Sequence, residues 1–131
     1  MDKPAYLEYE RATGRFFAVG ASGARSLLAF GYSGHGEGLN NPAMSHVKNV
    51  GPIPAGLWDV LADAAYRSTT LGPMVIPLKP LPTTETYGRS AFRIHGDNQA
   101  GDKSASEGCI ILPKPVRKMI LLWGNLRLSV T

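Results

Sequence analysis

The chain has 131 residues, of which 44% are hydrophobic and 18% charged, and its formal net charge is +4. This length and composition exclude a disordered chain and predict a single domain over residues 1–131. No apolar run approaches the roughly 20 residues of a membrane span, and Cys109 is the only cysteine, which excludes an internal disulfide. The small positive charge favours an anionic partner, such as nucleic acid, an acidic polymer of a cell wall, or an acidic protein.

Short apolar runs separated by glycine and proline predict a mainly β fold. Residues 6–10 and 15–19 flank a turn at Gly14 and are typical of a β-hairpin. Further strands are expected at 26–32, 57–61, 74–78, 92–95, 109–112 and 127–130. Pro77 lacks an N–H group, so the strand at 74–78 is expected to be an edge or bulged strand.

One helix is expected near the C-terminus. After Pro113, apolar residues recur at helical spacing from Val116 to Trp123, and Pro115 suits a first turn. Gly124 and the following residue form a stop signal. The N-terminal residues 1–4 lack the basic and apolar pattern of a leader, so we expect no ordinary secretory signal.

The connection over residues 33–56 is long for a compact domain. Connections of this length are usually functional or disordered. Glycine and proline are spaced along it in a way that indicates a fixed geometry, so we favour a functional loop.

Two apolar runs flank a polar loop in the centre of the sequence. His95 ends the first run and Cys109 begins the second. If the runs pair as neighbouring strands, the imidazole and the thiol meet, and the imidazole can take the thiol proton to give a nucleophilic thiolate. On these residues alone, a buried structural cysteine and a structural histidine remain alternatives.

The surroundings of this pair add two expectations. Alternation along the strand places Phe92 and Ile94 on the core side and Arg93 and His95 on the other side. Gly108 allows close approach of a substrate, and the backbone N–H groups of Gly108 and Cys109 are candidates for an oxyanion hole.

The sequence around this pair, His-Gly followed by Ser-x-Gly-Cys-Ile-x-Leu, resembles the active-site motif of YkuD-type L,D-transpeptidases. More closely, the chain resembles the type VI secretion L,D-transpeptidase effectors, the Tlde family. The resemblance covers nearly the whole chain, and its matching stretches are residues 31–38, 41–44, 50–54, 87–90, 94–97 and 105–113.

The resemblance implies a YkuD-like β-sandwich or barrel of short strands with long loops. It implies that Cys109 attacks the third residue of a peptidoglycan stem tetrapeptide and expels D-alanine, with His95 as acid and base. The resulting thioester is hydrolysed, exchanged with a D-amino acid, or cross-linked. It further implies a toxin acting in the periplasm of a target bacterium, with an immunity protein and a secretion adaptor or spike component as partners.

The chain departs from the general YkuD motif at two positions. Glu107 stands where the motif has histidine, and Ile111 stands where it has arginine. The residue that grips substrate carboxylates is therefore open, with Arg89 and Arg93 as candidates on position alone. A solvated surface arginine is the simpler interpretation of each.

Four further residues are candidates for substrate binding. Tyr32, His35, Gly96 and Ser106 lie in the matching stretches. A core aromatic, a structural loop histidine and a turn serine are the alternatives for Tyr32, His35 and Ser106. Asp97 is expected to cap its loop through the backbone.

Two other classes of protein remain alternatives. His35, His95 and Cys109 with a carboxylate could hold zinc, as in a zinc-dependent peptidoglycan hydrolase, although the spacing matches no familiar zinc pattern. A non-catalytic cell-wall-binding module also suits the charge. Basic and aromatic residues do not interleave along a strand as they do in nucleic-acid platforms, and we expect no nucleic-acid partner, no metal and no cofactor.

Overall fold

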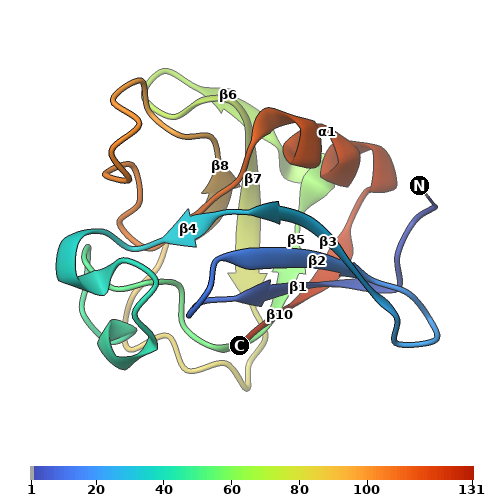
Figure 1. Ribbon diagram of the computed structural model, residues 1–131, viewed down its shortest axis with the longest axis horizontal. Coiled ribbons are helices and arrows are strands. Elements are labelled where there is room, and N and C mark those ends of the chain that lie inside the picture. Colours follow the sequence, from blue (N-terminus) through green and yellow to red (C-terminus); the bar gives the residue numbers. More distant parts are fainter. Residues whose placement is uncertain (1) are drawn as a thin grey trace.

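The β1–β2 hairpin begins a sheet whose strands alternate between core and surface. In the computed structural model, which describes residues 2–131, Leu7 and Tyr9 of β1 are fully buried between partly exposed neighbours. The remaining elements follow in chain order. The strands are β1 (Tyr6–Glu10), β2 (Arg15–Val19), β3 (Arg25–Phe30), β4 (Tyr32–Ser33), β5 (Gly56–Val60), β6 (Tyr66–Ser68), β7 (Gly72–Pro80), β8 (Arg93–His95), β9 (Ile110–Ile111) and β10 (Leu126–Val130), and the helix is α1 (Lys114–Trp123). The mainly β prediction with one short C-terminal helix is confirmed (Figure 1).

The sheet curls around its core, and Gly31 joins its two ends. The strand order is β3-β2-β1-β10-β5-β7-β8-β9-β4, with β6 added to β7. The terminal strands β3 and β4 are separated in the chain by Gly31 alone. A Cβ atom at Gly31 would lie 2.3 Å from the carbonyl oxygen of Ile111. Only glycine fits where the first and last strands of the sheet meet.

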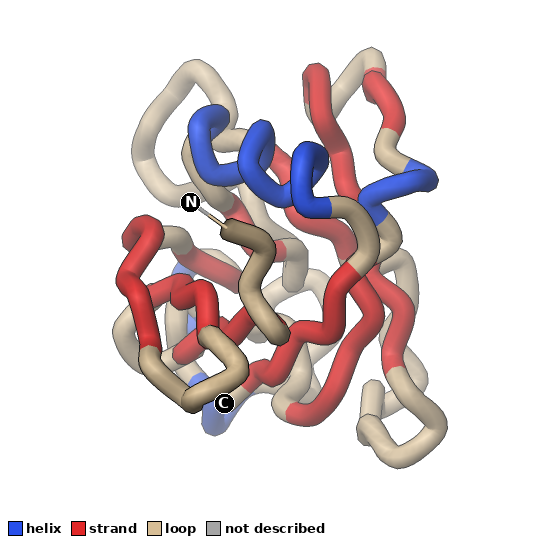
Figure 2. Tube along the Cα trace, turned by 90° about the vertical axis from the view of Figure 1, so that its right-hand side faces the viewer, coloured by secondary structure: helices blue, strands red, loops and turns tan. Residues whose placement is uncertain are grey.

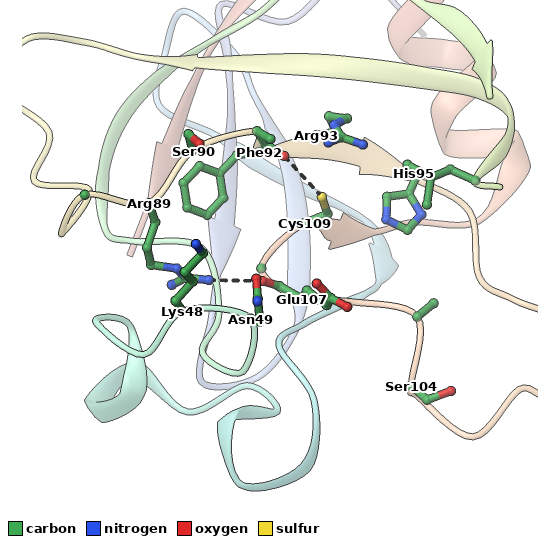
Figure 3. A pocket seen from close by; sticks show the side chains of 15 residues that line it. Lys48, Asn49, Arg89, Ser90, Phe92, Arg93, His95, Ser104, Glu107 and Cys109 are labelled. Carbon is green, nitrogen blue, oxygen red and sulfur yellow. Dashed lines mark hydrogen bonds between the residues drawn. The ribbon is translucent and has the colours of Figure 1, made fainter. Parts of the chain in front are cut away.

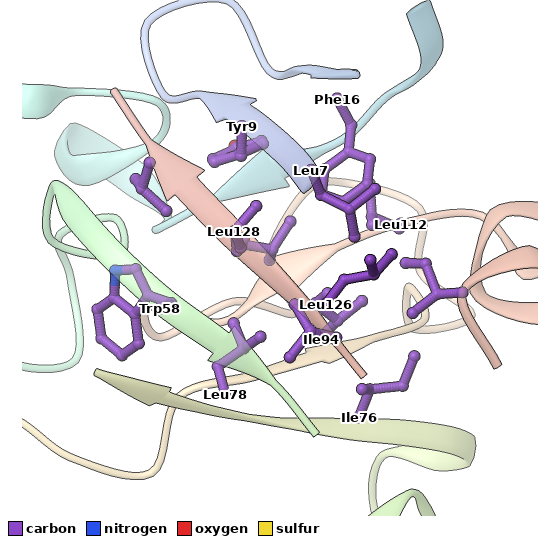
Figure 4. Packing of buried hydrophobic residues seen from close by; sticks show 14 of the residues in the cluster. Leu7, Tyr9, Phe16, Trp58, Ile76, Leu78, Ile94, Leu112, Leu126 and Leu128 are labelled. Carbon is purple, nitrogen blue, oxygen red and sulfur yellow. The ribbon is translucent and has the colours of Figure 1, made fainter. Parts of the chain in front are cut away.

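Buried apolar side chains from both halves of the chain form one core (Figure 4). Trp58 of β5 and Phe92, just before β8, contact edge to face with ring centroids 5.0 Å apart. Burying each large side chain of this kind contributes about 1.5–3 kcal/mol. The core therefore fixes β8, which carries His95, against the central strands.

Of the two expectations for the strand of Pro77, an edge position is wrong, whereas a bulge or irregularity is present where β7 pairs with β6, because Tyr66 lies opposite Val75 and Ser68 opposite Gly72. Strand β7 lies inside the sheet, between β5 and β8. The Pro77 carbonyl accepts a hydrogen bond from Leu61 N–H just beyond the end of β5, and β6 pairs with the earlier part of β7, from Gly72 to Val75. The missing N–H thus falls between two partner strands, where no ladder bond is lost.

Helix α1 crosses one end of the sheet and returns the chain to the central strand β10 (Figure 2). Val116 and Ile120 are buried in the core, at the spacing predicted from the sequence. The helix ends at Gly124, which has φ = 87°, a conformation that favours glycine. Within residues 2–131, no helix has the length and hydrophobicity required to cross a membrane.

The loops that follow β4 and β8 extend on the same side of the sheet (Figure 1). Two 3₁₀ turns, Gly36–Gly38 and Pro42–Met44, lie in the first loop, and His35 N–H donates to the Val50 carbonyl across it. A Cβ atom at Gly51 would lie 1.7 Å from the Met44 carbonyl oxygen. The predicted fixed geometry of this connection is confirmed.

Candidate active site

Parallel pairing of β8 with β9 brings His95 and Cys109 to one cavity. Ile94 pairs with Ile110 and His95 with Ile111, so Cys109, the residue just before β9, lies beside β8. Both side chains line a cavity of about 350 Å³ (Figure 3). The predicted meeting of the two runs as neighbouring strands is confirmed.

The predicted alternation along β8 is also confirmed. Phe92 and Ile94 belong to the hydrophobic core, and Phe92 also borders the cavity, whereas Arg93 and His95 line the cavity without belonging to the core. Because successive side chains of a strand point to opposite faces, the core contacts of two residues orient the other two.

Cys109 holds its thiol next to backbone groups. Its Sγ donates a weak hydrogen bond to the Ala91 carbonyl oxygen at 3.8 Å. Burial raises the pKa of this thiol, and the Glu107 charge adds to the rise, while the backbone N–H and positive charge of Arg93 oppose it. The resting form is therefore the thiol, with thiolate-stabilising groups of Arg93 next to the sulfur.

His95 is held in a defined tautomer. The residue is only 2% exposed, and its Nδ1 lies 2.8 Å from the carbonyl oxygen of Gly96. A carbonyl oxygen can only accept, so Nδ1 carries the proton and Nε2 keeps a lone pair. Burial lowers the pKa of the ring, and the charges of Arg93 and Arg117 lower it further. The neutral imidazole is thus favoured near neutral pH, in the form that a general base requires.

The thiol donates to Ala91 rather than to the imidazole in this conformation. Within residues 2–131, no hydrogen bond joins Cys109 Sγ to the His95 ring. Both groups nevertheless line the same cavity. Catalytic hydrogen bonds are often loose before substrate is bound.

Ser106 braces the turn that presents Cys109. Its hydroxyl is fully buried, donates to the Cys109 carbonyl at 2.6 Å, and accepts from the N–H groups of Gly34 and Gly108. These three bonds use the hydroxyl completely, which supports the interpretation of Ser106 as a residue that orients the loop. The Gly108 N–H is also engaged, so the predicted oxyanion donor that remains is the Cys109 N–H.

Ser33 supports the same turn from β4, and it was not among the residues selected from the sequence. Its hydroxyl is fully buried, donates to the Gly108 carbonyl at 3.0 Å and accepts from Ile53 N–H at 2.9 Å. The signal that could have identified it is its place in the matching stretch 31–38, where a serine follows a strand.

Arg89 is a buried residue, and its interpretation as a solvated surface arginine is wrong. The side chain is 7% exposed and donates to four backbone carbonyls, those of Ser45, Gly51, Pro52 and Glu107. It therefore ties the 34–55 loop to the residues just before Cys109. The four carbonyls belong to two different loops, so the sequence does not show that they converge on Arg89.

The other candidate residues have structural partners. The Tyr32 hydroxyl donates to Asp97 at 2.7 Å and accepts from Ala105 N–H, and burial raises the pKa of this phenol. His35 Nδ1 bonds the Ser106 carbonyl at 2.8 Å. Neither side chain lines the cavity at Cys109. The Gly96 carbonyl orients His95, and Asp97 caps its loop by accepting from Asn98 N–H, as expected.

The zinc alternative receives no support from the positions of these side chains. Between residues 2 and 131, no three histidine, cysteine, aspartate or glutamate side chains lie close enough together to hold a metal ion. The His35 ring is turned toward Ser106 by its hydrogen bond and does not line the cavity with His95 and Cys109.

Comparison with known proteins identifies the family. The Tlde1 domain matches residues 28–122, a span that contains β4, all but the last residue of the helix, and both His95 and Cys109. A search of curated proteins and a search of solved structures each found no match. The match covers more than half of the chain, which therefore belongs to the Tlde1 domain family, the Tlde family of type VI secretion effectors.

Proposed function

We propose that this protein is a cysteine-dependent L,D-carboxypeptidase and L,D-transpeptidase that acts on peptidoglycan stem tetrapeptides. The observation that carries the proposal is the hydrogen bond from His95 Nδ1 to the Gly96 carbonyl, in a cavity shared with Cys109. This bond leaves Nε2 as a proton acceptor beside a thiol. A binding module has no need of such a pair, whereas acyl transfer requires it.

Acylation follows from these positions. His95 Nε2 takes the Sγ proton, and the thiolate attacks the carbonyl carbon between the third residue and the terminal D-alanine. The Cys109 N–H is the candidate donor to the resulting oxyanion. The imidazolium then returns its proton to the alanine nitrogen, the C–N bond breaks, and D-alanine leaves a thioester on Cys109.

Deacylation reverses the proton transfers. His95 takes a proton from water or from the amine of a D-amino acid, which attacks the thioester carbonyl. The sulfur leaves and recovers a proton from the imidazolium. Water yields a tripeptide, and a D-amino acid yields an exchanged tetrapeptide. Both products deprive the wall of stems that can be cross-linked through D-alanine.

Family membership supports a proposal for the biological setting. Type VI effectors are toxins delivered to rival cells, so we place the activity in the periplasm of a target bacterium. The producing cell then needs an immunity protein, and delivery needs an adaptor or spike component.

Mass spectrometry of muropeptides tests the activity. The full chain is incubated with disaccharide tetrapeptides, with and without D-methionine. We expect loss of D-alanine without D-methionine and its replacement when D-methionine is present. Cys109→Ala and His95→Gln should abolish both changes. His46→Gln is the matched control, because His46 is exposed and lies outside the cavity lining. Unchanged muropeptides with the wild-type protein would contradict the proposal.

A further inference from the structure

Positive charge lines the cavity around Cys109 unevenly. Lys48, Arg89 and Arg93 contribute cations to the lining, and Glu107 contributes one carboxylate. Arg89 is engaged by four carbonyls, and Lys48 is exposed on its loop. Arg93 differs from Arg89, because its guanidinium has no hydrogen-bonding or carboxylate partner anywhere in residues 2–131, and from Lys48, because it is half-buried. Arg93 is therefore the half-buried cation of the cavity wall that is available to a ligand.

Arg93 is placed close to the reacting groups by the geometry of β8. It precedes His95 by two residues, so both side chains project to the same face, with their Cα atoms roughly 6.5–7 Å apart. The Arg93 backbone N–H faces the Cys109 sulfur. Figure 3 shows Arg93 and His95 on one side of Cys109, with Glu107 on the other. A bound anion at Arg93 would thus lie beside both the sulfur and the imidazole.

The position that carries arginine in the general YkuD motif cannot supply this charge here. Ile111 occupies it, is 3% exposed, and pairs with Tyr32 and His95 in the sheet. A cation for the substrate carboxylate must come from elsewhere in the cavity. Arg93, on the neighbouring parallel strand β8, lines the cavity at Cys109, whereas Ile111 does not.

We propose that Arg93 binds the α-carboxylate of the terminal amino acid that leaves during acylation, and of the D-amino acid that replaces it. The inference rests on the proposed function. The leaving nitrogen receives its proton from His95, and the carboxylate is attached to the carbon next to that nitrogen. Arg93 lies two residues from His95 on the same face of β8, so its guanidinium is placed to bind this carboxylate. Exchange runs through the same atoms in reverse, so the incoming amino acid uses the same residue.

This role makes the enzyme selective for a free chain end. A stem whose terminal D-alanine carries a carboxylate is held by Arg93, whereas its carboxamide analogue loses the ionic contact. An arginine fork also matches a carboxylate with two parallel hydrogen bonds, which lysine cannot reproduce. Arg93→Lys is therefore expected to retain part of the selectivity and Arg93→Gln none.

Alkylation of Cys109 tests the anion site without any peptidoglycan substrate. Iodoacetate and iodoacetamide react with the same thiolate, but only iodoacetate is an anion. The ratio of their rate constants therefore cancels changes in the thiolate fraction that a substitution at Arg93 causes. Measured against the neutral thiol N-acetylcysteine amide as a reference, the wild-type ratio should favour iodoacetate by roughly five- to tenfold, the scale of one nearby charge in a partly buried site. Arg93→Gln should remove most of this preference.

Two variants complete the test. Arg127→Gln should keep the wild-type ratio, because Arg127 is exposed, pairs with Asp59 and lies outside the cavity. Lys48→Gln should alter it less than Arg93→Gln. A wild-type ratio equal to the reference, or loss of the preference in Lys48→Gln alone, would overturn the assignment to Arg93.

Kinetics with a peptide substrate provide a second test of the role of Arg93. The ratio of kcat/KM for a tetrapeptide to that for its C-terminal carboxamide should fall about tenfold in Arg93→Gln, in proportion to one lost ionic contact. An unchanged ratio in an active variant would overturn the inference. An inactive wild-type protein that still prefers iodoacetate would contradict the proposed function and leave the anion site supported.

Discussion

His95 Nδ1 lies 2.8 Å from the carbonyl oxygen of Gly96, the next residue in the chain. The bond fixes both the ring orientation and the tautomer, because the acceptor is a carbonyl that the backbone holds in place. A Cβ atom at Gly96 would lie 2.5 Å from Arg117 Nη2, so the glycine allows the buried arginine to pack against this segment. The base is therefore oriented by main chain rather than by a carboxylate.

The pH dependence of Cys109 alkylation should reveal a thiol rather than a preformed ion pair. Burial raises the pKa of Cys109 and lowers that of His95, so both groups are neutral near pH 7. A raised thiol pKa means less thiolate at each pH, and the rate with iodoacetamide should still be rising above the usual thiol midpoint of about 8.5. Mass spectrometry of samples quenched at successive times measures the rate of Cys109 alkylation. A midpoint below that value would contradict the neutral pair.

Removing the hydroxyl of Ser106 should loosen the turn before Cys109. Ser106→Ala leaves the Gly34 and Gly108 N–H groups and the Cys109 carbonyl without their buried partner. We expect a loss of about 1–3 kcal/mol in the free energy of unfolding and a lower kcat. Denaturant titration and muropeptide assays measure the two effects. Ser26→Ala, on the exposed strand β3, is the control and should leave both values unchanged.

The glycine before the nucleophile has two separate requirements, which a pair of variants distinguishes. Gly108 has φ = 131°, and a Cβ atom there would lie 2.4 Å from Arg89 Nη2. Gly101 also has positive φ, but a Cβ atom there would meet nothing within 4 Å. Gly101→Ala should cost only the backbone strain, about 1–2 kcal/mol. Gly108→Ala should cost more and slow acylation, because Arg89 or the Cys109 turn must move. Equal losses of stability would exclude the clash.

Arg89 should matter for stability as well as for activity. Arg89→Met leaves four backbone carbonyls without their donor, so we expect a loss of about 3–5 kcal/mol, the range for breaking a buried charged network. Thermal unfolding measures it. Arg127→Gln removes only an exposed ion pair with Asp59 and should change stability by less than about 1 kcal/mol. A small effect of Arg89→Met would show that water replaces the guanidinium.

Local sequence patterns predicted the elements that carry the site. Alternation in β1 and β8 and helical spacing in α1 each record which side chains face the core, and this signal is local. The expectation that Pro77 lies in an edge strand failed for a different reason. Whether a proline interrupts a ladder depends on which strands flank it, and the position between β5 and β6 is decided only after the sheet has formed.

Local sequence patterns did not identify the residues that support the Cys109 turn. Ser33 and Arg89 bind carbonyls of residues that are distant in the chain. A buried arginine and an exposed one look alike in a sequence, because carbonyl acceptors belong to every residue. Their positions follow from the folding of the 34–55 loop over the Cys109 turn.

The amino-acid sequence alone was sufficient to predict the main strands and the helix. It was also sufficient to select His95, at the end of one apolar run, and Cys109, at the start of the next, as the candidate catalytic pair. Tertiary structure alone decided that β8 and β9 run parallel, that the thiol donates to Ala91, and that the imidazole presents Nε2. The physical reason is the range of the interactions. Side-chain periodicity is set by neighbours in the chain, whereas burial and backbone acceptors, which set the two pKa values and the tautomer, come from the packing of the whole fold.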